Sequence, residues 1–178
     1  MMTVTGIKRR IFVPTAIIAL AVISGSCFRM SYSTTGASIP AAAKTYSVQY
    51  VENQANLVEP GLSQQVTDAL KDYIQSNSNL VYVRQNGDID FEAVITGYDP
   101  STPATVVAGD VAAQNKFTIS MKVKFTCNVD PELDFESSFT RYKLYNVEPG
   151  FESIKEEFTT EIINLILEDI YKRAFVNW

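Results

Sequence analysis

The stretch Lys116–Phe125, KFTISMKVKF, alternates polar and apolar side chains without a break. Its apolar side chains would lie together on one face of a β-strand, because successive residues of a strand point to opposite faces. These apolar residues are Phe117, Ile119, Met121, Val123 and Phe125. Strict alternation is typical of an antiparallel sheet with one face in the core and the other in water. The stretch therefore predicts a sheet with one open, polar face.

Segments on both sides of this stretch continue the pattern. In Asp88–Tyr98, the residues expected on the buried face are Ile89, Phe91, Ala93 and Ile95. A further strand begins at Leu133, and its buried residues are expected to be Leu133, Phe135 and Phe139, followed after a change of phase by Tyr142 and Leu144. Such a change of phase predicts a β-bulge near Thr140 or Arg141.

Two shorter strands are expected nearer the N-terminus. Thr45–Val51 and Leu80–Arg84 are rich in aromatic and β-branched residues, which favour strands. The dipeptide Asn86-Gly87 follows the second of them, and both residues tolerate positive φ. We therefore expect a tight hairpin that joins Leu80–Arg84 to Asp88–Tyr98.

Two helices are predicted from a period of 3.6 residues. The first follows Pro60-Gly61 and ends at Asn77 to Asn79; its apolar face comprises Leu62, Val66, Ala69, Leu70, Tyr73 and Ile74. The second runs from about Ile154 to Phe175, with Ser153 and Glu156 in the spacing of a capping box and Lys172 and Arg173 in the last turn. Its apolar stripe comprises Ile154, Phe158, Ile162, Leu165, Ile166, Ile170 and Ala174 and is widened by Ile163, Leu167 and Tyr171. That width requires a second contact, with either the first helix or a partner protein.

The order of these elements predicts an α+β fold. We expect a two-layer sandwich with two helices on one face of a mostly antiparallel sheet of four to five strands, in a single domain over residues 45–178. About 150 residues after an N-terminal signal suffice for one hydrophobic core.

The N-terminus has the order of an export signal over residues 1–26. Three basic residues precede the apolar run Ile11–Ile23, and Ser24-Gly25-Ser26 leads into Cys27. Thirteen residues of helix reach roughly 20 Å, short of the roughly 30 Å membrane core, so a transmembrane anchor is the weaker interpretation. We expect acylation, with chains such as palmitate, on Cys27, and a tether over residues 27–44. The alternative is ordinary signal cleavage near Ser26, which would leave a free thiol.

Charge and composition exclude several classes of function. The chain has 15 basic and 20 acidic residues, and removal of the three basic residues of the signal leaves a net charge of −8. An acidic chain disfavours nucleic acid as a partner. There is no histidine, which excludes imidazole-based hydrolases and ordinary zinc sites. Cys127 is expected to be a buried or strand-end thiol. No cofactor or metal site is indicated.

Charged residues on the open face could serve chemistry or binding. The carboxylates Asp88, Asp90 and Glu92 are expected on an open face without a cleft, so we do not expect an enzyme. The phase of the strands places Asp90 and Glu136 beside Lys122, and Asp88 and Asp134 beside Lys124, which predicts a self-neutralised ladder of charges. The basic residues that lack such cross-strand partners are Lys116, Arg141 and Lys143.

The connection Asp99–Ala113, DPSTPATVVAGDVAA, is long for so small a domain. Its small and apolar composition suits surface contact better than chemistry. We therefore take Val106 and Val107 as candidate partner contacts, with a merely flexible hairpin end as the alternative.

Together these segments resemble the LptE-type lipopolysaccharide-assembly lipoproteins over essentially the whole chain after the signal. The residues that carry the resemblance are Cys27 followed by Tyr32-Ser33-x-Thr35-Gly36-Ala37-Ser38-Ile39-Pro40, Asn53, Ala55, Pro60, Gly87-Asp88-x-x-Phe91-Glu92, Gly97-Tyr98 and Asn115-x-x-Thr118-Ile119. It is the order of these pieces, taken together, that carries the resemblance.

The resemblance implies an outer-membrane lipoprotein that plugs the lumen of a β-barrel translocon of the LptD type. Such a protein helps the barrel to assemble and assists the insertion of lipopolysaccharide at the cell surface. No catalytic residues come with it, and Lys116, Arg141 and Lys143 become candidate lipopolysaccharide contacts. The competing hypothesis is a periplasm-facing lipoprotein adaptor or a surface adhesion subunit unrelated to lipopolysaccharide.

Overall fold

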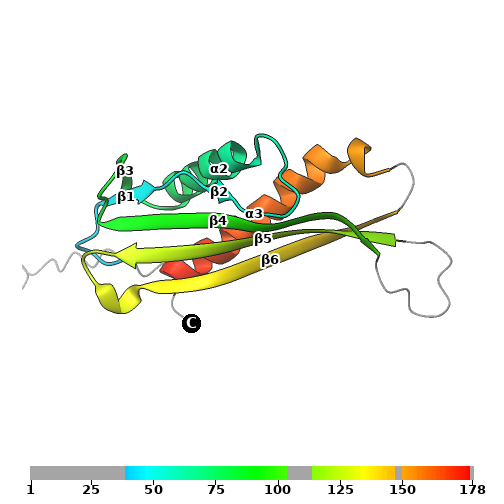
Figure 1. Cartoon of the computed structure of the whole chain (residues 1–178). Helices are drawn as coiled ribbons and strands as arrows, with labels where there is room; N and C mark the ends of the chain where they lie inside the picture. Colours follow the sequence, from blue (N-terminus) through cyan, green and yellow to red (C-terminus); the bar gives the residue numbers. More distant parts are fainter. Residues whose placement is uncertain (1–38, 104–113, 147–149, 177–178) are drawn as a thin grey trace, which may run out of the picture. The chain divides into compact units, whose positions relative to one another are not determined.

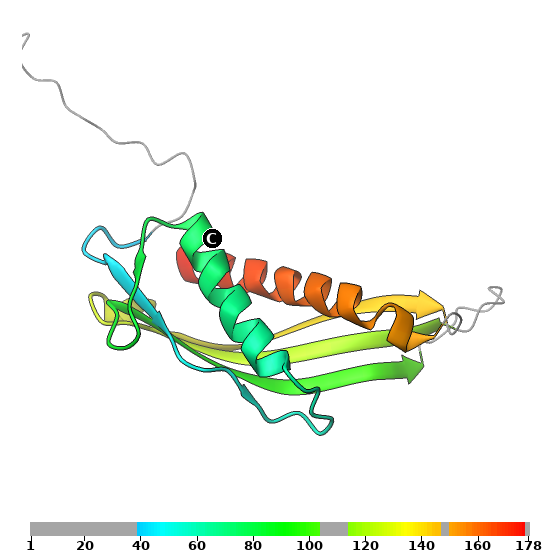
Figure 2. The same cartoon turned by 90° about the horizontal axis from the view of Figure 1, so that it is seen from above.

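The computed structural model describes residues 39–103, 114–146 and 150–176, all of which fall in one compact unit. The elements in chain order are β1 (Thr45–Val48), β2 (Glu52–Asn53), α2 (Leu62–Asn77), β3 (Val81–Tyr82), β4 (Ile89–Pro103), β5 (Gln114–Cys127), η1 (Pro131–Leu133), β6 (Phe135–Asn146), η2 (Phe151–Ser153) and α3 (Lys155–Phe175) (Figure 1). Both long helices lie over the same face of the sheet (Figure 2). The predicted α+β architecture is confirmed in this respect.

The sheet is mixed and has six strands, in the order β3-β1-β4-β5-β6 with β2 also paired to β4. The pairs β4–β5 and β5–β6 are antiparallel, whereas β1 pairs in parallel with both β3 and β4. The prediction of a mostly antiparallel sheet of four to five strands was therefore approximate. The physical reason is the crossover through α2, which returns the chain to β3 in the direction of β1.

The predicted hairpin at Asn86-Gly87 is wrong, because β3 pairs with β1 and not with β4. Asn86 does adopt a positive φ of 56°, but Gly87 does not. Gly87 lies against β1, where a Cβ atom would come within 2.6 Å of the backbone nitrogen of Ser47. The glycine is required by this close approach and not by a hairpin turn.

The alternation of β4 and β5 is confirmed. The inward residues Ile89, Phe91, Ala93 and Ile95 of β4 are at most 2% exposed, and so are the five apolar residues of the KFTISMKVKF stretch. The register of β4 against β5 shifts between Ile95 and Gly97 and again between Asp99 and Thr102. The irregularities of the sheet therefore lie in β4.

The bulge predicted in β6 is wrong, because β6 pairs with β5 in one continuous register. Tyr142 and Leu144 point to the open face and are 57% and 46% exposed. Tyr145 is buried instead, and its hydroxyl donates to the carbonyl of Pro100 at 2.6 Å. Unbroken alternation places Arg141 and Lys143 on the helix side of the sheet.

The long helix α3 begins without the predicted capping box. Its N-cap is Ile154, which makes no side-chain cap, and the Ser153 hydroxyl donates to the carbonyl of Gly150. Lys172 and Arg173 do lie in the last turn, as predicted.

The extra apolar width of α3 is covered by α2. The rings of Tyr73 and Tyr171 lie 5.8 Å apart, and the Tyr171 hydroxyl donates to the carbonyl of Asn77. Ile163 and Leu167 are each 1% exposed. The first helix therefore makes the second contact, and this part of α3 does not face a partner.

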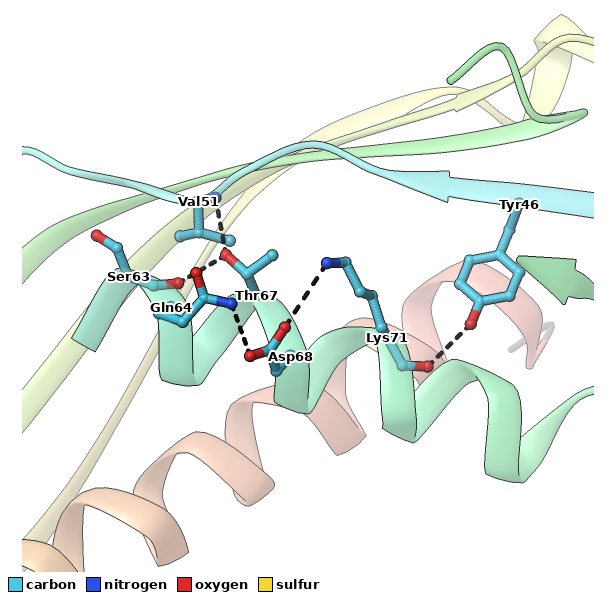
Figure 3. Close-up of polar contacts among 7 residues, drawn as sticks. All are labelled: Tyr46, Val51, Ser63, Gln64, Thr67, Asp68 and Lys71. Atoms are coloured by element: carbon cyan, nitrogen blue, oxygen red, sulfur yellow. Dashed lines mark hydrogen bonds and ion pairs between the residues drawn. The ribbon is translucent and has the colours of Figure 1, made fainter. Parts of the chain in front are cut away.

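Helix α2 is fastened to the strand segment before it (Figure 3). The backbone N–H of Val51 donates to the hydroxyl of Thr67 at 3.0 Å, and this hydroxyl donates to the carbonyl of Ser63 at 2.6 Å. One turn further on, the hydroxyl of Tyr46 donates to the carbonyl of Lys71 at 3.0 Å. Val51, Thr67 and Tyr46 are buried. These contacts hold α2 to β1 and to the segment that follows β1.

Candidate functional site

The open face of the sheet carries the charge ladder, in a different register from the one predicted. Lys124 stands opposite Glu92 on β4 and Glu136 on β6, whereas Lys122 stands opposite Val94 and Ser138. The ammonium of Lys124 lies 3.5 Å from Glu92, and that of Lys122 contacts Glu136. The hydrogen bond from Lys122 lowers the pKa of the Glu136 carboxyl. Both lysines are therefore neutralised, as predicted, but partly by different acids.

The other three predicted partners accept hydrogen bonds from backbone N–H groups or from uncharged side chains instead. Asp88 accepts from the N–H groups of Lys44 and Thr45 at 2.8 and 2.9 Å, and these bonds hold the pKa of its carboxyl below the ordinary value. Asp90 accepts from the side chains of Ser47 and Gln49, and Asp134 accepts from the N–H of Cys127. The predicted pairs with Lys122 and Lys124 are wrong for these acids.

Two of the three candidate basic contacts are engaged by α3. The guanidinium of Arg141 donates to both oxygens of Asp169, at 2.6 and 2.7 Å, and this partner raises the pKa of Arg141. Lys143 pairs with Glu161 and lies 4.3 Å from the ring centre of Phe158. Arg141 and Lys143 were expected to lack partners because only the acids of neighbouring strands were taken into account. Since β6 alternates without interruption, both side chains lie on the helix side of the sheet and pair with acids of α3.

The third candidate, Lys116, lies on the open face at the start of β5. Its ammonium stands 5.5 Å from the ring centre of Tyr142, and Leu144 is its partner on β6. No carboxylate of the described residues pairs with it. Lys116, Tyr142 and Leu144, which we call the Lys116 patch, thus combine one cation with two exposed apolar side chains.

A groove of about 650 Å³ lies at the other end of the open face, next to the end of β5. Its lining includes Arg84 and Lys124 together with Asp90 and Glu92. These charges cancel, so the groove offers no field that favours an anionic ligand.

Several predicted features lie outside the described residues, namely the signal, Cys27 with its tether up to residue 38, and the partner contacts Val106 and Val107. Cys127 is free, buried and last in β5, as predicted. Within the described ranges no helix has the length and apolarity to span a membrane, and no cluster of carboxylates or thiols could hold a metal ion.

Three apolar residues that the sequence predicted to be buried are exposed, namely Tyr142, Leu144 and Leu165. For Tyr142 and Leu144, the position of Tyr145 in the sequence could have indicated the exposure. Because Phe135, Phe139 and Tyr145 are all odd-numbered, a strand without a bulge would have placed Tyr142 and Leu144 on the open face. For Leu165 the periodicity of α3 gave no warning, since it belongs to the stripe that was expected to be buried.

The architecture places the chain in the class of small α+β proteins with two helices on one face of an open sheet. The model of the LptE lipopolysaccharide-assembly family matches residues 43–174, and the chain belongs to this family. The resemblance noted from the sequence is thereby confirmed, and the protein is a member of a lipopolysaccharide-assembly family.

The solved structures that match the chain are more distant. A minor lipoprotein from Acinetobacter baumannii has a TM-score of 0.47 at 11% identity, over 74% of this chain and 91% of that one. PelC from Paraburkholderia phytofirmans has a TM-score of 0.44 at 12% identity, over 75% and 91%. A putative neuraminyllactose-binding hemagglutinin homolog from Helicobacter pylori has a TM-score of 0.49 at 9% identity, over 79% and 88%. No curated protein sequence matches the chain.

Proposed function

We propose that this protein is an outer-membrane lipoprotein that plugs the lumen of an LptD-type β-barrel translocon. It helps the barrel to assemble and assists the insertion of lipopolysaccharide at the cell surface. The observation that carries the proposal is the family match over residues 43–174. The role requires surfaces and no catalytic group, and we propose that the protein is not an enzyme.

The open face of the sheet supports a position inside a water-filled barrel. Away from the Lys116 patch, this face carries hydroxyls and neutralised ion pairs, such as Ser120 with Thr140 at 2.9 Å and Lys122 with Glu136. A surface of this kind remains hydrated without carrying a strong field of either sign. It therefore suits a polar lumen better than contact with hydrocarbon.

The Lys116 patch supports a contact with the glycolipid. Lipopolysaccharide combines phosphate groups with apolar chains, and a lysine beside Tyr142 and Leu144 meets both kinds of group. Arg141 and Lys143 are less suited to this role, because each would first have to leave its partner on α3. We therefore place the glycolipid contact at Lys116.

Attachment to the membrane is proposed through Cys27. Mass spectrometry of the mature N-terminus should find a peptide that begins at an acylated Cys27. A peptide that begins at an unmodified Cys27, or upstream of it, contradicts the anchor.

The plug is tested by purification of the full-length protein from detergent-solubilised outer membranes. A C-terminally tagged chain should bring down one β-barrel protein in a stable complex of defined stoichiometry. A chain with Cys27→Ala is the matched control, because it keeps the domain and loses the anchor, and it should recover less of the barrel. Recovery of the anchored protein alone, or with partners that are not barrels, would favour the adaptor or adhesion hypothesis.

A further inference from the structure

β6 forms one edge of the sheet, and its outer side is unpaired among the described residues. It is terminal in the strand order, and all 12 of its residues follow one register with β5. It contains neither proline nor glycine. Natural edges are usually short, bulged or interrupted by proline, because a long, regular edge accepts another strand. The opposite edge, β3, has only two residues.

Large apolar side chains are exposed on both sides of this edge. Tyr142 and Leu144 project from β6 on the open face. On the helix side, Leu165 of α3 is 41% exposed, although its helix is otherwise packed against β5, β6 and α2. A strand added to β6 would place alternate side chains toward these two surfaces.

The charges at the edge cancel locally. Leu165 lies one helical turn from Glu161 and one turn from Asp169, and these two acids hold Lys143 and Arg141. The leucine is therefore flanked by two closed ion pairs that carry no net charge. A phosphate would find both cations engaged, whereas an uncharged segment would leave both pairs intact. Charge complementarity thus favours an uncharged occupant, and the row of backbone groups requires that occupant to be an extended polypeptide.

We propose that the edge of β6 and the adjacent side of α3 form a strand-addition groove for an extended, uncharged segment of the barrel partner. The inference rests on the proposed function, because it names the contact through which the two proteins join. Alternate residues of a strand direct both backbone groups outward, so a 12-residue edge offers on the order of ten hydrogen bonds. That is the number in a typical stable interface. Strand addition beside a helix is an established mode of peptide recognition.

Arg141 and Lys143 have a second interpretation, since inward-pointing charges can protect an edge from pairing. Isolated cations would do so by opposing burial. Here both are neutralised by α3, so a strand that covers them buries ion pairs and not free charges. The two interpretations differ in the exchange of the β6 amides within the complex.

Hydrogen exchange of the full-length protein, alone and in its complex with the co-purified barrel, tests the groove. The outward amides of β6 should exchange quickly in the free protein and at least tenfold more slowly in the complex. Leu165→Lys should lower recovery of the barrel at least fivefold. The matched control is Leu57→Lys, at a leucine that is 51% exposed in the loop before α2, and it should leave recovery unchanged. Circular dichroism should show the same fold for both variants.

Three results would overturn the groove, and they separate its failure from that of the plug. If the barrel is recovered while the β6 amides stay unprotected, Arg141 and Lys143 protect the edge from strand pairing, and the plug proposal remains valid. If the free protein is a dimer whose β6 amides are already protected, the occupant is a second copy. If the wild type recovers no barrel, both proposals fail together.

Discussion

The contact between Thr67 and Val51 allows a prediction whose magnitude follows from the structure (Figure 3). Thr67→Val preserves the shape of the side chain and removes the only acceptor described for the N–H of Val51, a residue with no exposed surface. A buried donor without a partner costs about 1 to 3 kcal/mol. With a urea m-value of about 2 kcal/mol/M, the unfolding midpoint should fall by about 0.5 to 1.5 M.

Thr67→Ser is the control for this change. It keeps the hydroxyl that bonds to Val51 and Ser63 and loses one buried methyl group, which costs about 0.8 kcal/mol or somewhat more if a cavity remains. Urea titration of the full-length protein in detergent, followed by circular dichroism, gives the midpoints. Hydrogen exchange separates the mechanisms, because the Val51 amide should exchange faster than wild type in the valine variant alone. A valine variant as stable as wild type, or an unchanged Val51 amide, would refute the reasoning.

Three further predictions concern binding and pH. Lys116→Ala should weaken lipopolysaccharide binding roughly fivefold, or about 1 kcal/mol for a partly exposed ion pair, while Lys122→Ala changes it little; equal losses in a vesicle-binding assay would contradict the placement. Val106→Asp or Val107→Asp should reduce recovery of the barrel without lowering the melting temperature, and full recovery would identify the loop as a simple connection. The pKa of the Asp88 carboxyl is lowered in the folded state, so its contribution to stability is present above the ordinary pKa of 3.8 and is lost as the pH falls through the lower, folded value. Asp88→Asn should remove this part of the acid dependence of stability, which thermal unfolding at a series of pH values measures.

The spacing of apolar residues within a segment was sufficient to predict the long strands and helices of the fold. The alternation around Met121 identified the central strand and its buried face, and the apolar period of Leu62–Asn77 identified α2 almost to the residue. Both signals arise within one element, where the chain itself sets the period. The helix face toward the core follows from that period without knowledge of any partner.

Pairing between elements could not be predicted in the same way. Asn86-Gly87 has the composition of a hairpin, yet the backbone of β1 occupies the space beside Gly87 and β3 pairs elsewhere. The predicted register of β4 was wrong because β4 continues to Pro103 and pairs with β5 through residues that were expected to begin a loop. Two register shifts, between Ile95 and Gly97 and between Asp99 and Thr102, lie in its distal half. The alternation of odd- and even-numbered residues determines the face of the sheet on which a side chain lies. Only the pairing of the strands in three dimensions determines which acid a lysine contacts.

In the candidate site, too, the face on which a side chain lies was easier to predict than the residue with which it pairs. The neutrality of Lys122 and Lys124 was predicted because many acids share their face, so an error in register replaced one carboxylate by another. Arg141 and Lys143 depended instead on one assumed bulge. When that bulge is absent, both side chains change face and meet acids of α3. A prediction supported by a whole face is robust, whereas a prediction that depends on a single irregularity is not.

The net charge of −8 that is expected once the signal is removed raises the question of how such a protein could meet an anionic glycolipid. Three of the acids, Glu161, Glu168 and Asp169, lie on α3, on the side of the sheet away from the Lys116 patch, and each of them is paired with a cation. Fields of exposed charges decay within about 8 Å at physiological ionic strength, so charges on the helix layer have little effect on the open face. The proposed glycolipid contact and the proposed strand-addition groove share Tyr142 and Leu144, but Lys116 belongs to the first alone and Leu165, on the helix side of the sheet, to the second alone. It follows that variants at Lys116 should lose glycolipid and keep the barrel, while Leu165→Lys should lose the barrel first.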